Sequence, residues 1–233
     1  MDITPSTHVA DIVTAAPATI AVFQKHQIEF CCGGHVPLGV VCEEEGLDLA
    51  AFLGELEAAQ RPFSDTRAWD TASLADLVAH IQQDYHQPLY EELPRLSAMM
   101  NKVATRHADR LPETLPPLKA TFDRLMQELI VHMRREDVVL FPAIVMFEGG
   151  SRSNAAVDDV FSAPVAAMER DHAAASDALA RMRDLTGGYE PPRDACPTFR
   201  GLYYGLADLE HRMRLHVRLE NDILFPRALA LGA

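Results

Sequence analysis

The stretch of sequence that decides the fold occurs twice, as HMRREDVVLFP at residues 132–142 and as HVRLENDILFP at residues 216–226. Each copy places a histidine and a glutamate four residues apart, and the pairs are His132 with Glu136 and His216 with Glu220. Side chains four residues apart share one face of a helix, so each copy presents an imidazole and a carboxylate to the same place. The Leu-Phe-Pro that ends each copy predicts core packing and a helix bend.

A further histidine precedes each copy at a similar distance, His86 before the first and His172 before the second. The two halves together supply four imidazoles and two carboxylates: His86, His132, Glu136, His172, His216 and Glu220. Two glutamates that face one another in a core repel, and a pair of bound cations offsets that repulsion. The set therefore predicts a site for two metals, and its ligands suit iron, manganese or zinc.

Composition places the chain among ordinary globular proteins. It has 233 residues, 48% of them hydrophobic and only 7% aromatic, which favours helices over sheets. The net charge of −13 argues against nucleic-acid binding, because phosphate contacts need clustered Lys and Arg. No segment resembles a signal peptide or a membrane span, and four cysteines do not make a disulfide framework. We expect a cytoplasmic protein that does not bind membranes.

Proline, glycine and capping residues divide the chain into a small N-terminal helical domain (1–59), a linker (60–71) and a four-helix bundle (72–233). The small domain should contain helices over 8–15, 17–26, 38–45 and 48–59. Between the second and third of these, Cys31-Cys32-Gly33-Gly34 predicts a turn, since paired glycines adopt backbone angles closed to other residues. Its adjacent thiols are candidates for redox chemistry.

Hydrophobic periodicity predicts four long helices, over about 72–106, 118–147, 158–185 and 196–229, and short connections between them indicate an all-α up-down bundle. Apolar stripes should carry the six ligands into the core, and two of these stripes continue beyond the glutamates to Val139 and Ile223. By the same periodicity His80 and His211 lie on polar faces, so both are expected to point to water.

With these motifs, residues 72–229 resemble hemerythrin-like di-iron bundles. The Cys31-Cys32-Gly33-Gly34 turn and its short helical domain resemble the leading domain of the Repair of Iron Centres family, the ScdA/YtfE group. The resemblance implies a di-iron protein that restores iron–sulfur clusters damaged by nitrosative or oxidative stress. It also implies that both glutamates bridge the irons beside an oxo or hydroxo group. Acidic residues near the family's site match Glu128 and Asp171, which would line a path for iron or protons.

Two mechanisms fit this function: delivery of a labile iron, with Cys31 and Cys32 docking or relaying, or reduction of nitric oxide by the metal pair. The expected partners are damaged iron–sulfur proteins, with nitric oxide or oxygen as small ligands, and a homodimer is compatible with the sequence. The alternatives are a hemerythrin-like sensor or carrier of oxygen or nitric oxide, and a helical interaction module with vestigial ligands. Oxygen-carrying hemerythrins use further histidines and an aspartate bridge, which this chain lacks.

Overall fold

The computed structural model describes residues 3–30, 35–61, 63–150 and 157–232, and every regular element in these ranges is a helix. The chain divides into two compact units, Met1–Ser64 with Tyr189–Asp208, and Asp65–Gly188 with Leu209–Ala233. The domain boundaries expected at 60–71 stay a prediction. Within the described ranges, none of the helices combines the length and the apolar character needed to cross a membrane.

The N-terminal part of the chain folds into short helices close to those expected. They are α1 (Val9–Ala15), the 3-10 turn η1 (Pro17–Thr19), α2 (Ile20–Lys25), α3 (Leu38–Glu44) and α4 (Leu49–Ala59). Asp48 caps α4, because its carboxylate accepts a hydrogen bond of 2.8 Å from the Ala51 amide. Phe23 and Phe52 meet edge to face in the core, with centroids 5.6 Å apart. The predicted turn at residues 31–34 lies outside the described residues.

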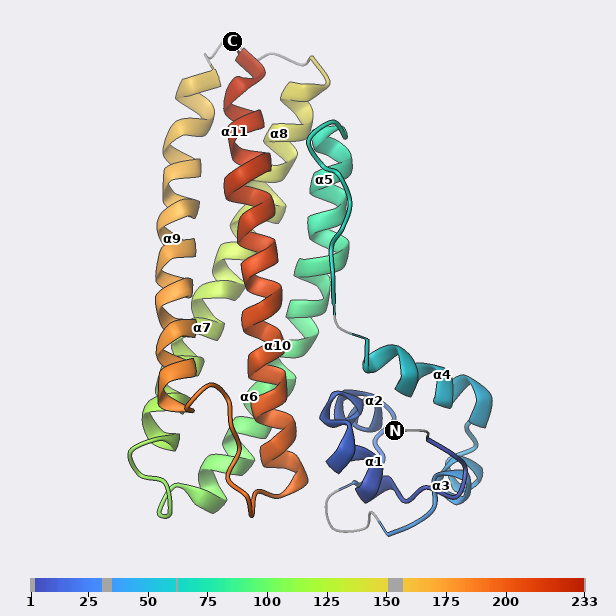
Figure 1. The fold of residues 1–233 in the computed structure, drawn as a ribbon. Coiled ribbons are helices and arrows are strands. Elements are labelled where there is room, and N and C mark those ends of the chain that lie inside the picture. Colours follow the sequence, from blue (N-terminus) through green and yellow to red (C-terminus); the bar gives the residue numbers. More distant parts are fainter. Residues whose placement is uncertain (1–2, 31–34, 62, 151–156, 233) are drawn as a thin grey trace. The chain divides into compact units, whose positions relative to one another are not determined.

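Four helical rods follow, and Figure 1 shows that successive rods run in opposite directions. The first is α5 (Leu74–Ile81), η2 (Gln82–His86) and α6 (Gln87–His107); the second is α7 (Leu115–Arg135), η3 (Glu136–Leu140) and α8 (Phe141–Glu148); the third is α9 (Val157–Leu185); the fourth is α10 (Pro197–Leu219), η4 (Glu220–Leu224), α11 (Phe225–Leu229) and η5 (Ala230–Gly232). The Glu148 carboxylate accepts from the Leu74 and Ala75 amides and so joins the end of α8 to the start of α5. The predicted all-α up-down bundle is confirmed.

Three of the rods contain a single π-helical turn, and each of these turns ends two residues before a proline. The prolines are Pro88, Pro142 and Pro226, and the turns before them are η2, η3 and η4. Proline has no N–H and its ring crowds the carbonyl four residues earlier. The backbone opens by one residue here, so that Phe141 donates to the Glu136 carbonyl and Phe225 to the Glu220 carbonyl. The expected bend is therefore a widened turn.

The π turns shift the core stripes by one residue. The expected stripe positions are buried up to Glu136 and Glu220, but Val139 is 65% exposed and Ile223 is partly exposed. Leu140 and Leu224 are buried in their places, at 4% and 0% exposure. The prediction that Val139 and Ile223 face the interior was therefore wrong, because a fixed period of 3.6 residues cannot follow a helix through an inserted residue.

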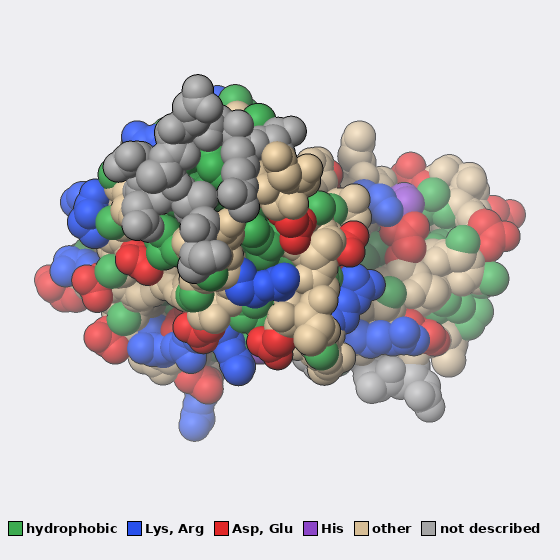
Figure 2. All heavy atoms as spheres, turned by 90° about the horizontal axis from the view of Figure 1, so that it is seen from above, with side chains coloured by type: hydrophobic (Ala, Val, Ile, Leu, Met, Phe, Trp, Pro, Cys, Tyr) green, Lys and Arg blue, Asp and Glu red, His purple; other side chains and the backbone are tan. Residues whose placement is uncertain are grey.

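One face of the molecule is mixed in charge. Figure 2 shows Asp and Glu interspersed with Lys and Arg on the face that it displays, with hydrophobic side chains scattered between them. Much of any protein's surface is apolar, so scattered hydrophobic side chains need no special explanation. The informative features lie inside the bundle, where ionisable side chains are buried.

Candidate metal centre

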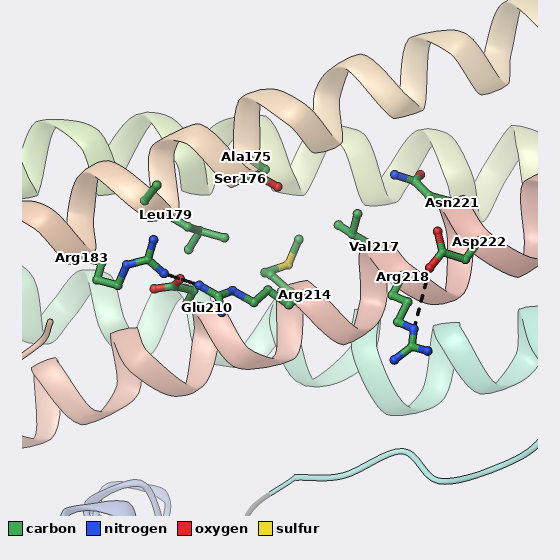
Figure 3. Close-up of a pocket in the computed structure, with 12 residues that line it drawn as sticks. Ala175, Ser176, Leu179, Arg183, Glu210, Arg214, Val217, Arg218, Asn221 and Asp222 are labelled. Atoms are coloured by element: carbon green, nitrogen blue, oxygen red, sulfur yellow. Dashed lines mark hydrogen bonds and ion pairs between the residues drawn. The ribbon is translucent and has the colours of Figure 1, made fainter.

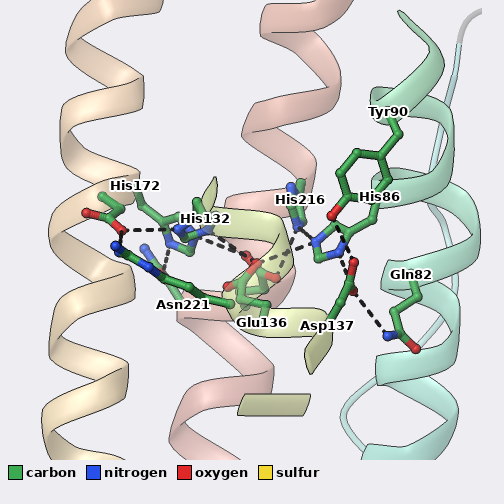
Figure 4. A network of polar contacts seen from close by, with 12 residues as sticks. Gln82, His86, Tyr90, His132, Glu136, Asp137, His172, His216 and Asn221 are labelled. Carbon is green, nitrogen blue, oxygen red and sulfur yellow. Dashed lines mark hydrogen bonds and ion pairs between the residues drawn. The ribbon is translucent and has the colours of Figure 1, made fainter. Parts of the chain in front are cut away.

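Six titratable side chains from the four rods meet inside the bundle, and none of them is more than 3% exposed. They are His86 from η2, His132 from α7, Glu136 from η3, His172 from α9, His216 from α10 and Glu220 from η4. Figure 4 shows the histidines converging on the glutamate from opposite sides. The structure thus brings together all six predicted side chains, four from the repeated stretch and two from the histidines that precede it.

The four imidazoles form two facing pairs. The Nε2 atoms of His86 and His216 are 3.0 Å apart, and those of His132 and His172 are also 3.0 Å apart. The carboxylates lie between the pairs, with Glu220 Oε1 3.0 Å from His216 Nε2, Glu220 Oε2 3.1 Å from His172 Nε2, Glu136 Oε2 3.2 Å from His132 Nε2 and Glu136 Oε2 3.5 Å from His86 Nε2. Every ring therefore turns its Nε2 atom toward the centre.

These side chains make two sets of four possible ligands. The sets are His86, Glu136, His216 and Glu220, and His132, Glu136, His172 and Glu220, and within each the ligand atoms lie within 4.8 Å of one another. Both sets contain both glutamates, so the carboxylates stand between two positions that each have their own pair of imidazoles.

The donor set fits a bound cation. Glu136 Oε1 is buried and accepts no hydrogen bond from the described residues, while Glu136 Oε2 and Glu220 Oε2 are buried beside imidazole Nε2 atoms that also point to the centre. A buried charged oxygen without a partner is costly, and metal coordination is one of the few ways to satisfy it. Imidazole and carboxylate together suit iron and its neighbours in the first transition row.

Outer partners fix the tautomer of the histidines. His172 Nδ1 lies 2.8 Å from Asn221 Oδ1, and because an amide oxygen only accepts, Nδ1 must carry the proton. The neutral ring then offers its Nε2 lone pair to the centre. His86 is held in the same way, with Nδ1 2.7 Å from Asp137 Oδ1.

Two phenylalanines complete this support. Phe141 stacks on His86 with centroids 5.5 Å apart, and Phe225 stacks on His172 with centroids 5.9 Å apart. The interpretation of Leu-Phe-Pro as packing and a bend missed this contact with the candidate ligands. The sequence does carry the signal, because Phe141 and Phe225 occupy the same position in the repeat, as do Asp137 and Asn221.

The carboxylates draw positive charge into the centre. Burial by itself lowers the pKa of His132, but the adjacent Glu136 carboxylate outweighs burial and raises that pKa to about 9. Burial by itself also lowers the pKa of His86 and of His172. The hydrogen bond with Asp137 helps to raise the pKa of His86 in spite of burial, and the hydrogen bond with Glu220 does the same for His172. Burial opposes ionisation of Glu220, yet the surrounding imidazoles hold its pKa below the usual range. Cations of either kind, protons or metals, are favoured here.

Two of the remaining predicted site residues, Asp171 and Glu128, lie outside the set of six side chains. Asp171 is 44% exposed at its side chain, with Oδ2 3.4 Å from His132 Nδ1 and 3.7 Å from Arg135 Nη1. Glu128 lies on the surface at 49% exposure and pairs with Arg124 at 2.8 Å. Cys31 and Cys32 lie outside the described residues.

Of the two histidines expected to point to water, His211 is exposed and His80 is not. The prediction for His80 was wrong, since its side chain is only 7% exposed and its Nε2 atom lies 2.5 Å from Asp65 Oδ2. Asp65 belongs to the segment that was expected to be a linker, and this segment covers the polar face of α5. A periodicity argument within one helix could not see that cover.

A cavity of about 300 Å³ lies beside the centre, between α9 and the fourth rod. Figure 3 shows its charged lining: Arg183 and Arg214 both pair with the buried Glu210, and Arg218 lies 3.7 Å from Asp222. Asn221, which holds His172, lines the same cavity. The guanidinium groups of Arg183, Arg214 and Arg218 are each paired with a carboxylate in the cavity lining.

Comparisons with known proteins agree with this architecture. Residues 77–228 match the model of the hemerythrin HHE cation-binding domain, and residues 5–60 match the ScdA_N model, described as a domain of unknown function. The chain is 37% identical over 221 residues to the iron-sulfur cluster repair protein YtfE of Cronobacter sakazakii, covering 94% of this chain and 95% of that protein. It is 34% identical over 218 residues to the YtfE protein of Yersinia pseudotuberculosis, covering 94% of each chain.

The fold and the buried histidine–glutamate centre define a cation-binding bundle of the hemerythrin type. The N-terminal residues 5–60 add a match to a second family model, ScdA_N. Because the similarity to the repair proteins extends over almost the whole chain, this protein belongs to the YtfE family of iron-sulfur cluster repair proteins.

Proposed function

We propose that this chain holds two iron ions at its buried centre and restores iron–sulfur clusters damaged by nitrosative or oxidative stress. The observation that carries the proposal is the sharing of Glu136 and Glu220 between two four-residue ligand sets. A carboxylate that faces two imidazole pairs is suited to bridge two metals, beside an oxo or hydroxo group. The relatives named as cluster repair proteins supply the functional context.

Iron fits the ligand set better than calcium, magnesium or structural zinc. Calcium and magnesium prefer oxygen ligands alone, and structural zinc sites are usually rich in thiolate. Four imidazoles and two shared carboxylates also leave coordination positions for small ligands, which suits redox chemistry. When bound, the iron pair would supply electrons for such chemistry or a metal ion for export.

The chain's own residues do the rest. Asp137 and Asn221 orient His86 and His172 through their Nδ1 atoms, so the rings need no rearrangement when a metal binds. Asp171 stands half exposed beside His132 and offers a carboxylate between the centre and solvent. This position supports a role in moving iron or protons, whereas Glu128 pairs with Arg124 on the surface.

Counting metals tests the centre first. Protein purified with iron available should contain close to two iron atoms per chain, and His216→Ala should lose most of them. The matched control is His211→Ala, which removes an exposed histidine from the same helix. One zinc per chain, or equal iron in wild type and His216→Ala, would contradict the proposal.

Repair is tested on a nitric-oxide-damaged [4Fe–4S] protein, the kind of cytoplasmic client that we propose. Iron-loaded wild type should restore the cluster. Loss of repair in Asp171→Asn with unchanged iron content would favour iron delivery. Catalytic formation of nitrous oxide by the reduced protein would favour nitric oxide reduction, and binding of oxygen or nitric oxide without any repair would favour a sensor or carrier.

A further inference from the structure

A second buried polar cluster lies on the His216 side of the metal centre. Its members are Asp65 and Trp69, which precede α5, with His80 from α5 and Tyr85 from η2. The side chains of Asp65 and His80 are 6% and 7% exposed, and Tyr85 is 1% exposed as a residue. None of these side chains belongs to the six candidate ligands.

Asp65 is the acceptor at the heart of this cluster. The Tyr85 hydroxyl donates to Asp65 Oδ2 at 3.1 Å, and His80 Nε2 lies 2.5 Å from the same oxygen. Trp69 Nε1 donates to Asp65 Oδ1 at 3.3 Å. Against the cost of burial, the hydrogen bond from His80 lowers the pKa of Asp65, which favours the carboxylate form that accepts the hydrogen bond from the phenol.

The same residues form a row of rings that begins at a candidate metal ligand. Tyr85 stacks on His216 with centroids 5.3 Å apart and planes 23° apart. His80 meets Tyr85 edge to face at 5.6 Å, and Trp69 stacks on His80 at 4.4 Å. The exposed Arg67 lies over the Trp69 ring, with its guanidinium carbon 5.5 Å from the centroid. The row therefore runs from the centre toward solvent.

Anchoring the chain before α5 to the bundle uses Asp65, Trp69, His80 and the Tyr85 hydroxyl, but it does not require the Tyr85 ring to stack on His216. A phenylalanine would fill the same space against His216, whereas a buried phenol requires a partner for its hydroxyl. Here the partner is an ionised carboxylate and the ring stacks on a candidate ligand. An oxidisable ring against the centre, with a base for its proton, is the arrangement needed for coupled loss of an electron and a proton.

We infer that Tyr85 is a reversible one-electron donor that protects the metal centre when hydrogen peroxide meets an iron pair able to give only one electron. The inference rests on the proposed iron function. Hydrogen peroxide takes two electrons and two protons to form two waters. Bound iron would supply one electron, Tyr85 supplies the other, and the two protons come from solvent, while the phenolic proton moves along the 3.1 Å hydrogen bond to Asp65 Oδ2.

The step is reversed by a one-electron reductant from solution, such as ascorbate or a thiol. The electron returns to the Tyr85 phenoxyl through the row that ends near Arg67, and the proton returns from Asp65. Without Tyr85, the missing electron must come from another group near the centre, such as a ligand histidine. Loss of ligands would then release iron.

The experiment uses the full iron-loaded chain, reduced until about one electron per pair remains, mixed with one equivalent of hydrogen peroxide and frozen. Electron paramagnetic resonance should show an organic radical near g = 2, and ring-deuterated tyrosine should narrow that signal. Tyr85→Phe should abolish the signal and increase the iron lost per equivalent of peroxide. The control is Tyr90→Phe, which removes a phenol that donates to Asp137 instead.

Asp65→Asn separates the proton acceptor from the phenol, and it should reduce the radical yield while Tyr85 remains in place. Iron content is measured in every sample. A wild type that binds two irons but forms no tyrosyl radical, or a radical that survives in Tyr85→Phe, would overturn this inference alone. A wild type without iron would overturn the proposed function as well. Retention of the radical in Tyr90→Phe, with loss in Tyr85→Phe, would support the assignment.

Discussion

Phe225→Leu tests whether the repeated phenylalanine supports the metal centre as well as the core. Phe225 is fully buried and its ring is almost parallel to His172, with 6° between the planes. Replacing a buried phenylalanine by alanine costs about 3–5 kcal/mol, and a volume-conserving apolar swap costs less than about 1.5 kcal/mol. Leucine falls between these limits, and we expect a loss of about 2 kcal/mol in the free energy of unfolding.

The matched control is Phe161→Leu. Phe161 is also fully buried, but its ring meets Phe147 edge to face at 5.1 Å, with no candidate ligand in that contact. In metal-free protein both variants should lower the melting temperature of the bundle by about 4–8 °C, measured by circular dichroism. Only Phe225→Leu should weaken iron retention, by about tenfold in competition with a chelator, because it frees the His172 ring to turn.

Comparison of the two variants tests whether the Phe225 ring has a role beyond packing. If Phe161→Leu loses iron as readily as Phe225→Leu, iron retention follows general stability and the stacked ring has no separate role. If Phe225→Leu melts normally and keeps its iron, the estimate of packing at this position is wrong too.

Three further outcomes follow from the centre and its surroundings. Asp137→Ala should weaken metal binding about 10–100-fold in a chelator competition, since His86 loses the acceptor that fixes its tautomer, and unchanged affinity would refute that role. The pKa of Asp65 is lowered in the folded chain, so its contribution to stability is present above about pH 4 and is lost as the pH falls through the lowered value. Metal-free Asp65→Asn should therefore show a flatter acid limb than wild type in urea unfolding at pH 2–6, and identical slopes would contradict this. Removing the metal should lower the melting temperature, because binding stabilises only the folded bundle, and equal melting of both forms would mean that no metal is held there.

The sequence was sufficient for the helices and for the six converging side chains, because both depend on local periodicity. His172, for example, follows Phe161, Val165 and Met168 along one stripe, and all four are buried as that spacing requires. The buried apolar residues and the candidate ligands lie on the same face of each helix, so the hydrophobic periodicity predicts the positions of both.

Periodicity gave the wrong burial for a residue that is covered by a distant part of the chain, and for a residue that follows a change from α-helix to π-helix. His80 lies on a polar face of α5, yet Asp65 and Trp69 cover it, and nothing within the helix indicates that cover. Val139 is exposed because η3 inserts a residue between Glu136 and the next core position. Pro142 indicated that the helix is irregular here. The hydrogen bond from the Phe141 amide to the Glu136 carbonyl shows that the irregularity is a π-helical turn.

The burial of the ligands also sets a kinetic limit. With no candidate ligand more than 3% exposed, a bound ion departs only when side chains or rods move aside, so the rate of departure cannot exceed the rate of that opening. Any exchange with an outside acceptor is then limited by the opening motion when the acceptor is in excess. Raising the acceptor concentration would speed transfer only up to the opening rate, and the plateau would measure that rate directly.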